Sequence, residues 1–262
     1  MIDTLFHDCN RPDVPGASVM VIKDGKVLLA KSYGLADLEN KVPSAPDVNY
    51  RLASVTKQFT AMAIMMLADA GKMSFDDSIT RFFPEFPAYG KPITVRHLLN
   101  HTSGLIDYED IIPPGTTLPV LDINALRLLQ QQDHTYFPPG NQFRYSNTGY
   151  AFLALIVEKV SGQTFAAFLR DKIFMPLHMD QTLAYESGIS TVSNRAYGYT
   201  AQKNGDYIRT DQSVTSSVLG DGGIYSSIND LYKWDQALYT TKLVSKKTLA
   251  AAFTPGKSTL HE

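Results

Sequence analysis

One long stretch, Arg51–Gly71, has apolar side chains on every side of a helical wheel. A single apolar stripe is typical of a surface helix, whereas apolar positions all round predict a buried one. Gly71 follows the last apolar residues, where a glycine commonly ends a helix. The pattern therefore predicts a central, buried helix over this stretch.

Other hydrophobic patterns predict the elements around that helix. Two apolar runs, Ala17–Ile22 and Lys26–Ser32, flank Asp24-Gly25, a dipeptide typical of β-hairpin turns. Helical patterns follow further along the chain. We expect Thr94 to cap the first of these helices and Gly104 to end it, and Asp122 to cap the second. Ser227 or Asn229 would cap a later one. The ranges are Thr94–Gly104, Asp122–Gln132, Ala151–Val160, Thr164–Ile173, Asn229–Tyr239 and Lys246–Phe253. We expect loop with short strands over Pro176–Thr210 and a tight turn at Gly220–Gly223.

Composition excludes several classes of function. A net charge of −2 over 262 residues provides no basic field for nucleic acid, and no apolar run approaches the ~20 residues of a membrane span. Cys9 is the only cysteine, so an intrachain disulfide is impossible. The first residues lack the basic and apolar regions of a signal peptide, so either the protein is not exported or Met1 begins a trimmed chain. Compartment and oligomeric state stay open.

The start of the predicted central helix carries candidate chemistry. Ser54 and Lys57 are spaced i and i+3, which places both side chains on one face of the first turn. Burial lowers the pKa of an amine in general, and a neutral amine can take the proton of a neighbouring hydroxyl. The alternative is a capping serine beside a solvated lysine. Burial of the residues after Lys57 favours the first interpretation, because a cation leading into a core helix needs a partner.

A second candidate motif lies on a turn between Pro138-Pro139-Gly140 and the helix predicted from Ala151. Tyr145 could act there as a base, and Asn147 offers both a donor and an acceptor to a substrate amide. The alternative is a packed tyrosine and a capping asparagine. His97 and His101, at i and i+4, could form a metal pair, but no third ligand lies near in sequence. We interpret them as histidines that hydrogen-bond loops.

Four segments, in this order and spacing, resemble the serine β-lactamase and penicillin-binding protein superfamily, in particular class C β-lactamases, D-Ala-D-Ala carboxypeptidases and their esterase relatives. The resemblance runs from about Ala17 to the chain end. The segments are Arg51–Ala61 (RLASVTKQFTA), Ile93–Leu105 (ITVRHLLNHTSGL), Tyr145–Asn147 (YSN), and Gly222–Ser227 (GGIYSS) with Asp230, Leu231 and Trp234.

The resemblance implies a role for each candidate residue. Ser54 would be the acylated nucleophile and Lys57 its general base or the electrostatic partner of that base. Tyr145 would relay a proton to the leaving group or activate the deacylating water, and Asn147 would hold the amide side chain of the substrate. The Ser54 backbone N–H would supply half of an oxyanion hole. The substrate would be a β-lactam, a D-Ala-D-Ala-type peptide or a small ester, without a metal or an organic cofactor.

The implied fold is α/β: an antiparallel sheet region and a large, mainly helical domain, with the site between them. We expect the sheet region to begin in residues 1–55, with its hairpin at 17–32. The helical domain would occupy 56–218, and 219–262 would return toward the sheet.

One family feature is not found in the sequence. A third motif, K-T-G or H-x-G, is expected on a strand near the C-terminus. Lys247-Thr248-Leu249 has the wrong third residue and a helical pattern, and His261-Glu262 is the chain end. The chain thus resembles about the first two thirds of a family member, and we expect it to lack the C-terminal strands. The alternative function is therefore a penicillin-binding or sensor module that acylates, or only binds, without efficient turnover.

Overall fold

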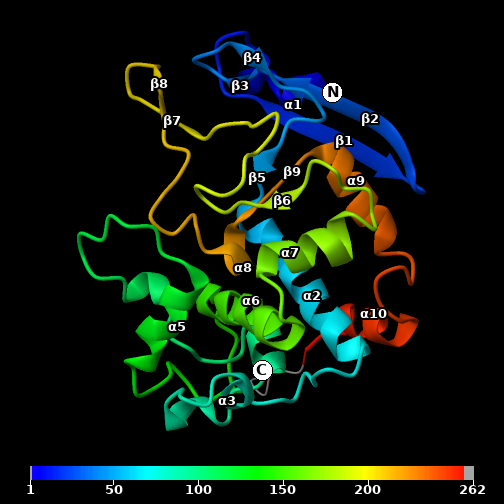
Figure 1. Ribbon diagram of the computed structural model, residues 1–262. Coiled ribbons are helices and arrows are strands. Elements are labelled where there is room, and N and C mark those ends of the chain that lie inside the picture. Colours follow the sequence, from blue (N-terminus) through cyan, green and yellow to red (C-terminus); the bar gives the residue numbers. More distant parts are fainter. Residues whose placement is uncertain (1, 257–262) are drawn as a thin grey trace.

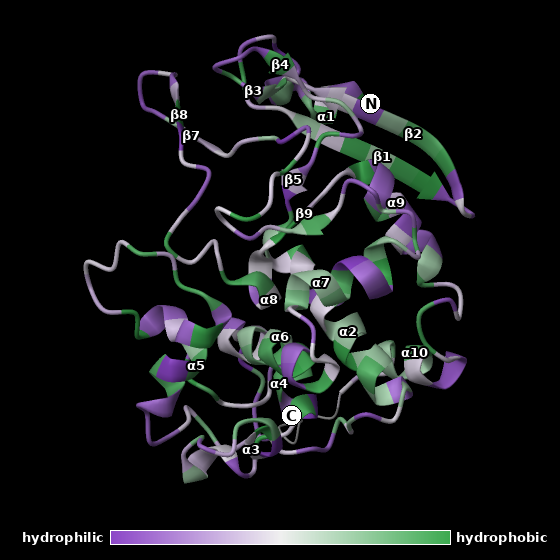
Figure 2. Ribbon diagram, in the orientation of Figure 1, coloured by the Kyte–Doolittle hydropathy of each residue, from purple (hydrophilic) through white to green (hydrophobic). Residues whose placement is uncertain are grey.

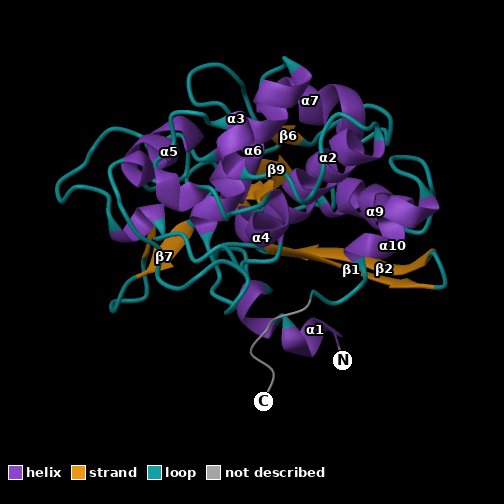
Figure 3. Cartoon of the chain, turned by 90° about the horizontal axis from the view of Figure 1, so that it is seen from below, coloured by secondary structure: helices purple, strands orange, loops and turns teal. Residues whose placement is uncertain are grey.

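The N-terminal hairpin forms as the sequence predicts. In this computed structural model, which describes residues 2–256, β1 (Ala17–Lys23) pairs antiparallel with β2 (Lys26–Tyr33). Asp24 and Gly25 take the turn, with φ of 50° and 71°, the left-handed region that glycine and aspartate tolerate best. The hairpin lies at the top of the molecule in Figure 1 and along one side of the helices in Figure 3.

The other strands are short, and every pairing among them is antiparallel. β3 (Leu35–Asp37) pairs with β4 (Val42–Pro43), and β7 (Tyr199–Ala201) pairs with β8 (Tyr207–Arg209). A three-stranded sheet has β9 (Ile224–Ser226) in the centre, between β5 (Tyr50–Arg51) and β6 (Leu183–Ala184). Across residues 2–256 these remain separate small sheets, and β1 and β2 pair only with each other.

The central helix is confirmed. A 3₁₀ turn, Ala53–Thr56, leads into α2 (Lys57–Asp69), whose residues are buried on several sides, as the apolar pattern predicts. Gly71, with φ of 69°, follows the end of the helix. α2 packs against α6 (Asn147–Ser161), and Figure 2 shows α2 largely in hydrophobic colours. The two helices form the middle of the core.

The remaining helices surround this pair. α7 runs on into a π-helical turn, and three 3₁₀ turns lie in loops. The bounds of the helices are α1 (Ile2–Leu5), α3 (Ile79–Phe82), α4 (Val95–Leu99), α5 (Asp122–Gln130), α7 (Phe165–Leu169), its π turn (Arg170–Phe174), α8 (Leu219–Gly222), α9 (Ile228–Ala237) and α10 (Lys246–Ala252). The 3₁₀ turns are His7–Cys9, Ala88–Gly90 and Tyr108–Asp110.

Three local predictions were wrong, two at helix ends and one at an expected turn. Thr94 caps α4 as predicted, but α4 ends at Leu99, because His101 takes a positive φ of 57° before Gly104 is reached. Asp122 is the first residue inside α5 rather than its cap, since its carboxylate accepts N–H groups from α8. The expected turn at Gly220–Gly223 is the short helix α8 followed by β9.

Two predictions further along the chain were confirmed. α9 is capped by Ser227, one of the two candidates, and the Lys247-Thr248-Leu249 run is helical, in α10. His261-Glu262 lies outside the described residues.

Among residues 2–256 no single helix is both long and apolar enough to cross a membrane. The pair formed by α6 and Phe165–Phe174, bent by 77°, is long and apolar enough by length and composition only.

Candidate active site

Ser54 lies at the sharp turn between β5 and α2. The preceding residue, Ala53, has a φ of 45°, in the left-handed region that a residue with a Cβ rarely adopts. Such strain is commonly found at functional sites, where the surrounding structure enforces it. Here the turn leaves the Ser54 side chain exposed while Thr56 and Lys57, which follow, are buried. A hydroxyl is therefore presented to solvent at the start of the core helix.

Lys57 is the centre of the site. Only 7% of its surface is exposed, and its Nζ donates to Ser54 Oγ at 3.2 Å, to Asn147 Oδ1 at 2.8 Å and to the Asp221 carbonyl at 2.9 Å. These three acceptors account for the three protons of an ammonium group. The structure thus brings Ser54, Lys57 and Asn147 together, and it supplies the partners that a buried cation requires.

The face of the Tyr145 ring lies beside the Lys57 amine. Lys57 Nζ is 4.9 Å from the Tyr145 ring centroid and 5.5 Å from that of Tyr150. The Tyr145 ring also stacks on His101, with centroids 4.6 Å apart and planes 26° apart. The tyrosine is 46% exposed, so it forms the edge of an open site and is not a packed core residue.

Asn147 begins α6 but does not cap it. Ser146 is the cap, since its side chain accepts the Gly149 N–H at 3.2 Å. The capping-asparagine interpretation is therefore wrong. The Asn147 N–H donates to Asp107 Oδ2 at 2.8 Å, and its side-chain oxygen is held by Lys57. With the oxygen occupied, the amide Nδ2 is the group that remains to face a ligand.

Asp221 is a site residue that the sequence analysis missed. Its carbonyl accepts from Lys57, while its buried carboxyl accepts the Tyr108 hydroxyl at 2.8 Å. Burial raises the pKa of this carboxyl to about 7, against a smaller lowering by the Tyr108 hydrogen bond and the Lys57 charge. Thr60 holds the same helix through the Gly220 carbonyl at 2.7 Å. The only sequence signal is an acidic residue between two glycines, directly before the fourth family segment.

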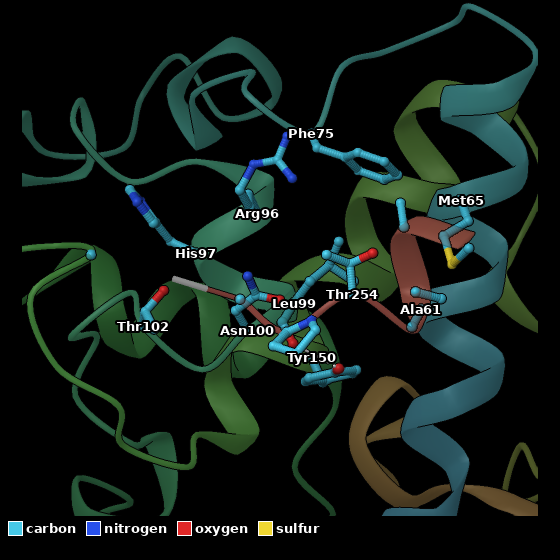
Figure 4. Close-up of a pocket in the computed structure, with 15 residues that line it drawn as sticks. Ala61, Met65, Phe75, Arg96, His97, Leu99, Asn100, Thr102, Tyr150 and Thr254 are labelled. Carbon is cyan, nitrogen blue, oxygen red and sulfur yellow. Dashed lines mark hydrogen bonds between the residues drawn. The ribbon is translucent and has the colours of Figure 1, made fainter. Parts of the chain in front are cut away.

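A small cleft of about 120 Å³ opens at Ser54. It is lined by Arg51, Ala53, Ser54, Glu109, Asn147, Ser213, Thr215, Asp221 and Gly222. A larger cavity of about 580 Å³, shown in Figure 4, lies between α2, α4 and α10 and contains none of the four candidate residues. The small cleft, rather than the large cavity, therefore exposes two of the four candidate residues, Ser54 and Asn147.

The two histidines each accept a backbone hydrogen bond. His97 Nδ1 accepts the Thr94 N–H at 3.2 Å, and His101 Nδ1 accepts the Ser146 N–H at 3.1 Å. Burial lowers the pKa of both, that of His101 to about 4 with help from the Lys57 charge, so both imidazoles are neutral at pH 7. Within residues 2–256 no group of three or more His, Cys, Asp or Glu side chains is arranged to hold a metal ion.

Sequence comparison identifies a family for the chain. The sequence model of the Beta-lactamase family matches residues 2–260. Penicillin-binding protein 4* of Bacillus subtilis (strain 168) is 33% identical over 267 residues. That alignment covers 97% of this chain but only 59% of the relative, so the chain spans about three fifths of that protein.

Solved structures give the same result for the fold. The octameric penicillin-binding protein homologue from Pyrococcus abyssi matches with a TM-score of 0.80 and 31% identity, over 95% of this chain and 57% of that one. A D-amino acid amidase from Ochrobactrum anthropi SV3 matches with a TM-score of 0.79 and 28% identity, over 90% and 68%. The family match over nearly every residue and this β-lactamase-like fold agree: the chain belongs to the Beta-lactamase family.

Proposed function

We propose that this protein is a serine hydrolase that works through an acyl-enzyme on Ser54. The observation that carries the proposal is the 3.2 Å hydrogen bond between Lys57 Nζ and the exposed Ser54 hydroxyl. A nucleophile and a base within hydrogen-bond reach, with the base oriented by a third group, are what covalent catalysis of acyl transfer requires. Here Asn147 and the Asp221 carbonyl orient the amine.

In the proposed acylation, Lys57 has first lost the proton that it donates to Ser54 in the structure, and its nitrogen then takes the Ser54 proton as Oγ attacks the substrate carbonyl carbon. The new Oγ–C bond forms, the bond from that carbon to the leaving nitrogen or oxygen breaks, and the leaving group receives a proton relayed through Tyr145. Water then attacks the ester, which releases the acid and restores the serine hydroxyl. The Ser54 N–H stabilises the developing oxyanion, and Asn147 Nδ2 donates to the substrate amide.

The proposed substrate is a β-lactam, a D-amino-acid peptide or amide, or a small ester. A penicillin-binding protein and a D-amino acid amidase among the similar proteins support this range. The site would lie where a sheet region within residues 1–55, a mainly helical region over 56–218 and a returning segment over 219–262 meet. The pairing of β5 with β9 close to Ser54 supports this division.

The test follows one acyl reporter over time. Purified protein is mixed with a fluorescent penicillin and, separately, with a p-nitrophenyl ester, and both adduct and released product are measured. Product formation beyond one equivalent, abolished by Ser54→Ala, is the expected result. A stable adduct without turnover would show that the protein is the acylating sensor module, the alternative function, and not a hydrolase. Reaction with neither reporter, or turnover that Ser54→Ala leaves unchanged, would overturn the proposal.

A further inference from the structure

A second cavity lies away from Ser54, between α5, α6, α7 and the start of α8. It encloses about 490 Å³, within the range of ordinary small-molecule sites. None of Ser54, Lys57, Tyr145 and Asn147 lines it. Its lining residues are Pro119, Leu121, Asp122, Ile123, Ala154, Leu155, Glu158, Phe165, Tyr185, Glu186, Ser187, Ile189, Ser217 and Leu219.

The floor and the rim of this cavity are both apolar. Leu155 and Phe165, 8% and 1% exposed, form part of the floor. At the rim Leu121, Ile123 and Ile189 expose 47%, 37% and 79% of their surface. Apolar side chains inside a hollow and around its mouth favour a ligand with a hydrocarbon body, because its burial removes apolar surface from water on both partners.

Three carboxylates interrupt this apolar lining: Asp122, Glu158 and Glu186. Among residues 2–256, no lysine, arginine or histidine lines the cavity. In the part of the chain that the structure describes, the ion pairs all involve other carboxylates. Within residues 2–256, therefore, no cationic side chain pairs with the carboxylates of this cavity.

Two of the three carboxylates, Asp122 and Glu158, are held in place by backbone N–H groups. Asp122 accepts the N–H groups of Leu219 and Gly220 at 2.9 and 3.0 Å, and Glu158 Oε1 accepts the Phe165 N–H at 2.9 Å. Burial raises the pKa of Asp122 to about 6, with a further contribution from the charge of Glu158. A positively charged group in the cavity would relieve this repulsion, and the second oxygen of Glu158 is available to accept from it.

We propose that this cavity is a second binding site, for an organic cation that carries a primary ammonium group on a hydrocarbon body. The ammonium group binds at Glu158 and Glu186, and the hydrocarbon body lies on Leu155 and Phe165. The wall formed by Asp122 continues into α8, whose Asp221 carbonyl accepts from Lys57, so the ligand sits against the helix that supports the candidate active site.

The experiment uses three probes with the same eight-carbon chain: n-octylammonium, 1-octanol and octanoate. Calorimetric titration of the purified protein should give saturable binding of octylammonium at one site, weaker binding of octanol and no binding of octanoate. In Glu158→Gln/Glu186→Gln the affinity for octylammonium should fall on the order of 10-fold while that for octanol stays the same, because charged hydrogen-bond partners are lost and shape is kept. Glu85→Gln, at an exposed carboxylate outside the cavity, is the matched control.

Methyl NMR locates the ligand. Octylammonium should shift the methyl signals of Leu155, Ile123 and Ile189, in wild type and in Ser54→Ala alike. This result therefore does not depend on whether the hydrolase proposal is correct. A melting curve verifies that the Gln variant is folded. Equal affinity for all three probes, unchanged octylammonium affinity in the folded Gln variant, or shifts confined to other methyl groups would each overturn the site.

Discussion

The carboxyl of Asp221 should make the stability of this protein depend on pH near neutrality. It is buried beneath the candidate site, with a pKa raised from 3.8 to about 7. A carboxyl whose pKa is raised by folding stabilises the folded state fully only below its unfolded pKa, and this contribution is lost as pH rises through the folded pKa. Asp221→Asn keeps the shape and an oxygen for the Tyr108 hydroxyl but cannot ionise.

The size of the effect follows from the two pKa values. Between pH 5 and pH 7 the folded carboxyl holds a proton that the unfolded one has already lost. Wild type should therefore lose about 2 to 3 kcal/mol of unfolding free energy between pH 5 and pH 8 through this one group, at 1.36 kcal/mol per pH unit. Asp122, whose pKa is about 6, titrates in both proteins, so the difference removes its own titration and keeps only its interaction with Asp221.

Urea unfolding at pH 5, 6, 7 and 8 measures the difference directly. The unfolding free energy of Asp221→Asn minus that of wild type should rise by about 2 to 3 kcal/mol across this series. Asp69→Asn is the matched control, because hydrogen bonds from Ser245 and Thr248 lower the pKa of that exposed carboxyl below the window. It should give a constant offset. A constant offset for Asp221→Asn as well would refute the reasoning.

Two further changes test the neighbours of Lys57. Tyr145→Phe keeps the ring beside the amine and removes the hydroxyl, so kcat for a reporter ester should fall ~10²–10⁴-fold with KM little changed; a raised KM with unchanged kcat would make Tyr145 a binding residue. Gly220→Ala would bring a Cβ within 2.3 Å of the Tyr150 carbonyl, so α8 must shift from α6, at a cost of about 1 to 3 kcal/mol in urea unfolding together with slower acylation. Unchanged stability and rate would show that α8 does not position Lys57.

The sequence predicted those features of the fold and the site that depend on residues close together in the chain. The i, i+3 spacing of Ser54 and Lys57 was enough to place them together, since helical geometry fixes that relation. Asp24-Gly25 likewise predicted the hairpin. Tyr145 and Asn147 lie about 90 residues away along the chain, and only the resemblance connected them with Ser54.

What the sequence could not reveal depends on contacts between distant segments. Asp221 reaches Lys57 only because α8 packs against α6 and the 3₁₀ turn before α2. Asp122 was expected to cap its own helix, but its carboxylate binds N–H groups nearly 100 positions away. In both cases a side chain or carbonyl satisfies a partner from another element, and no periodicity marks that choice.

The central claim, that Ser54 is the acylated nucleophile, is tested most directly by mapping the adduct. Wild type, Ser54→Ala and Ser213→Ala are treated with a β-lactam, quenched, digested and analysed by tandem mass spectrometry. Ser213 lines the same cleft and is the matched control. We predict the added mass on Ser54 in wild type and in Ser213→Ala, and on no residue in Ser54→Ala. An adduct that persists in folded Ser54→Ala, or that maps to another residue in wild type, would contradict the account.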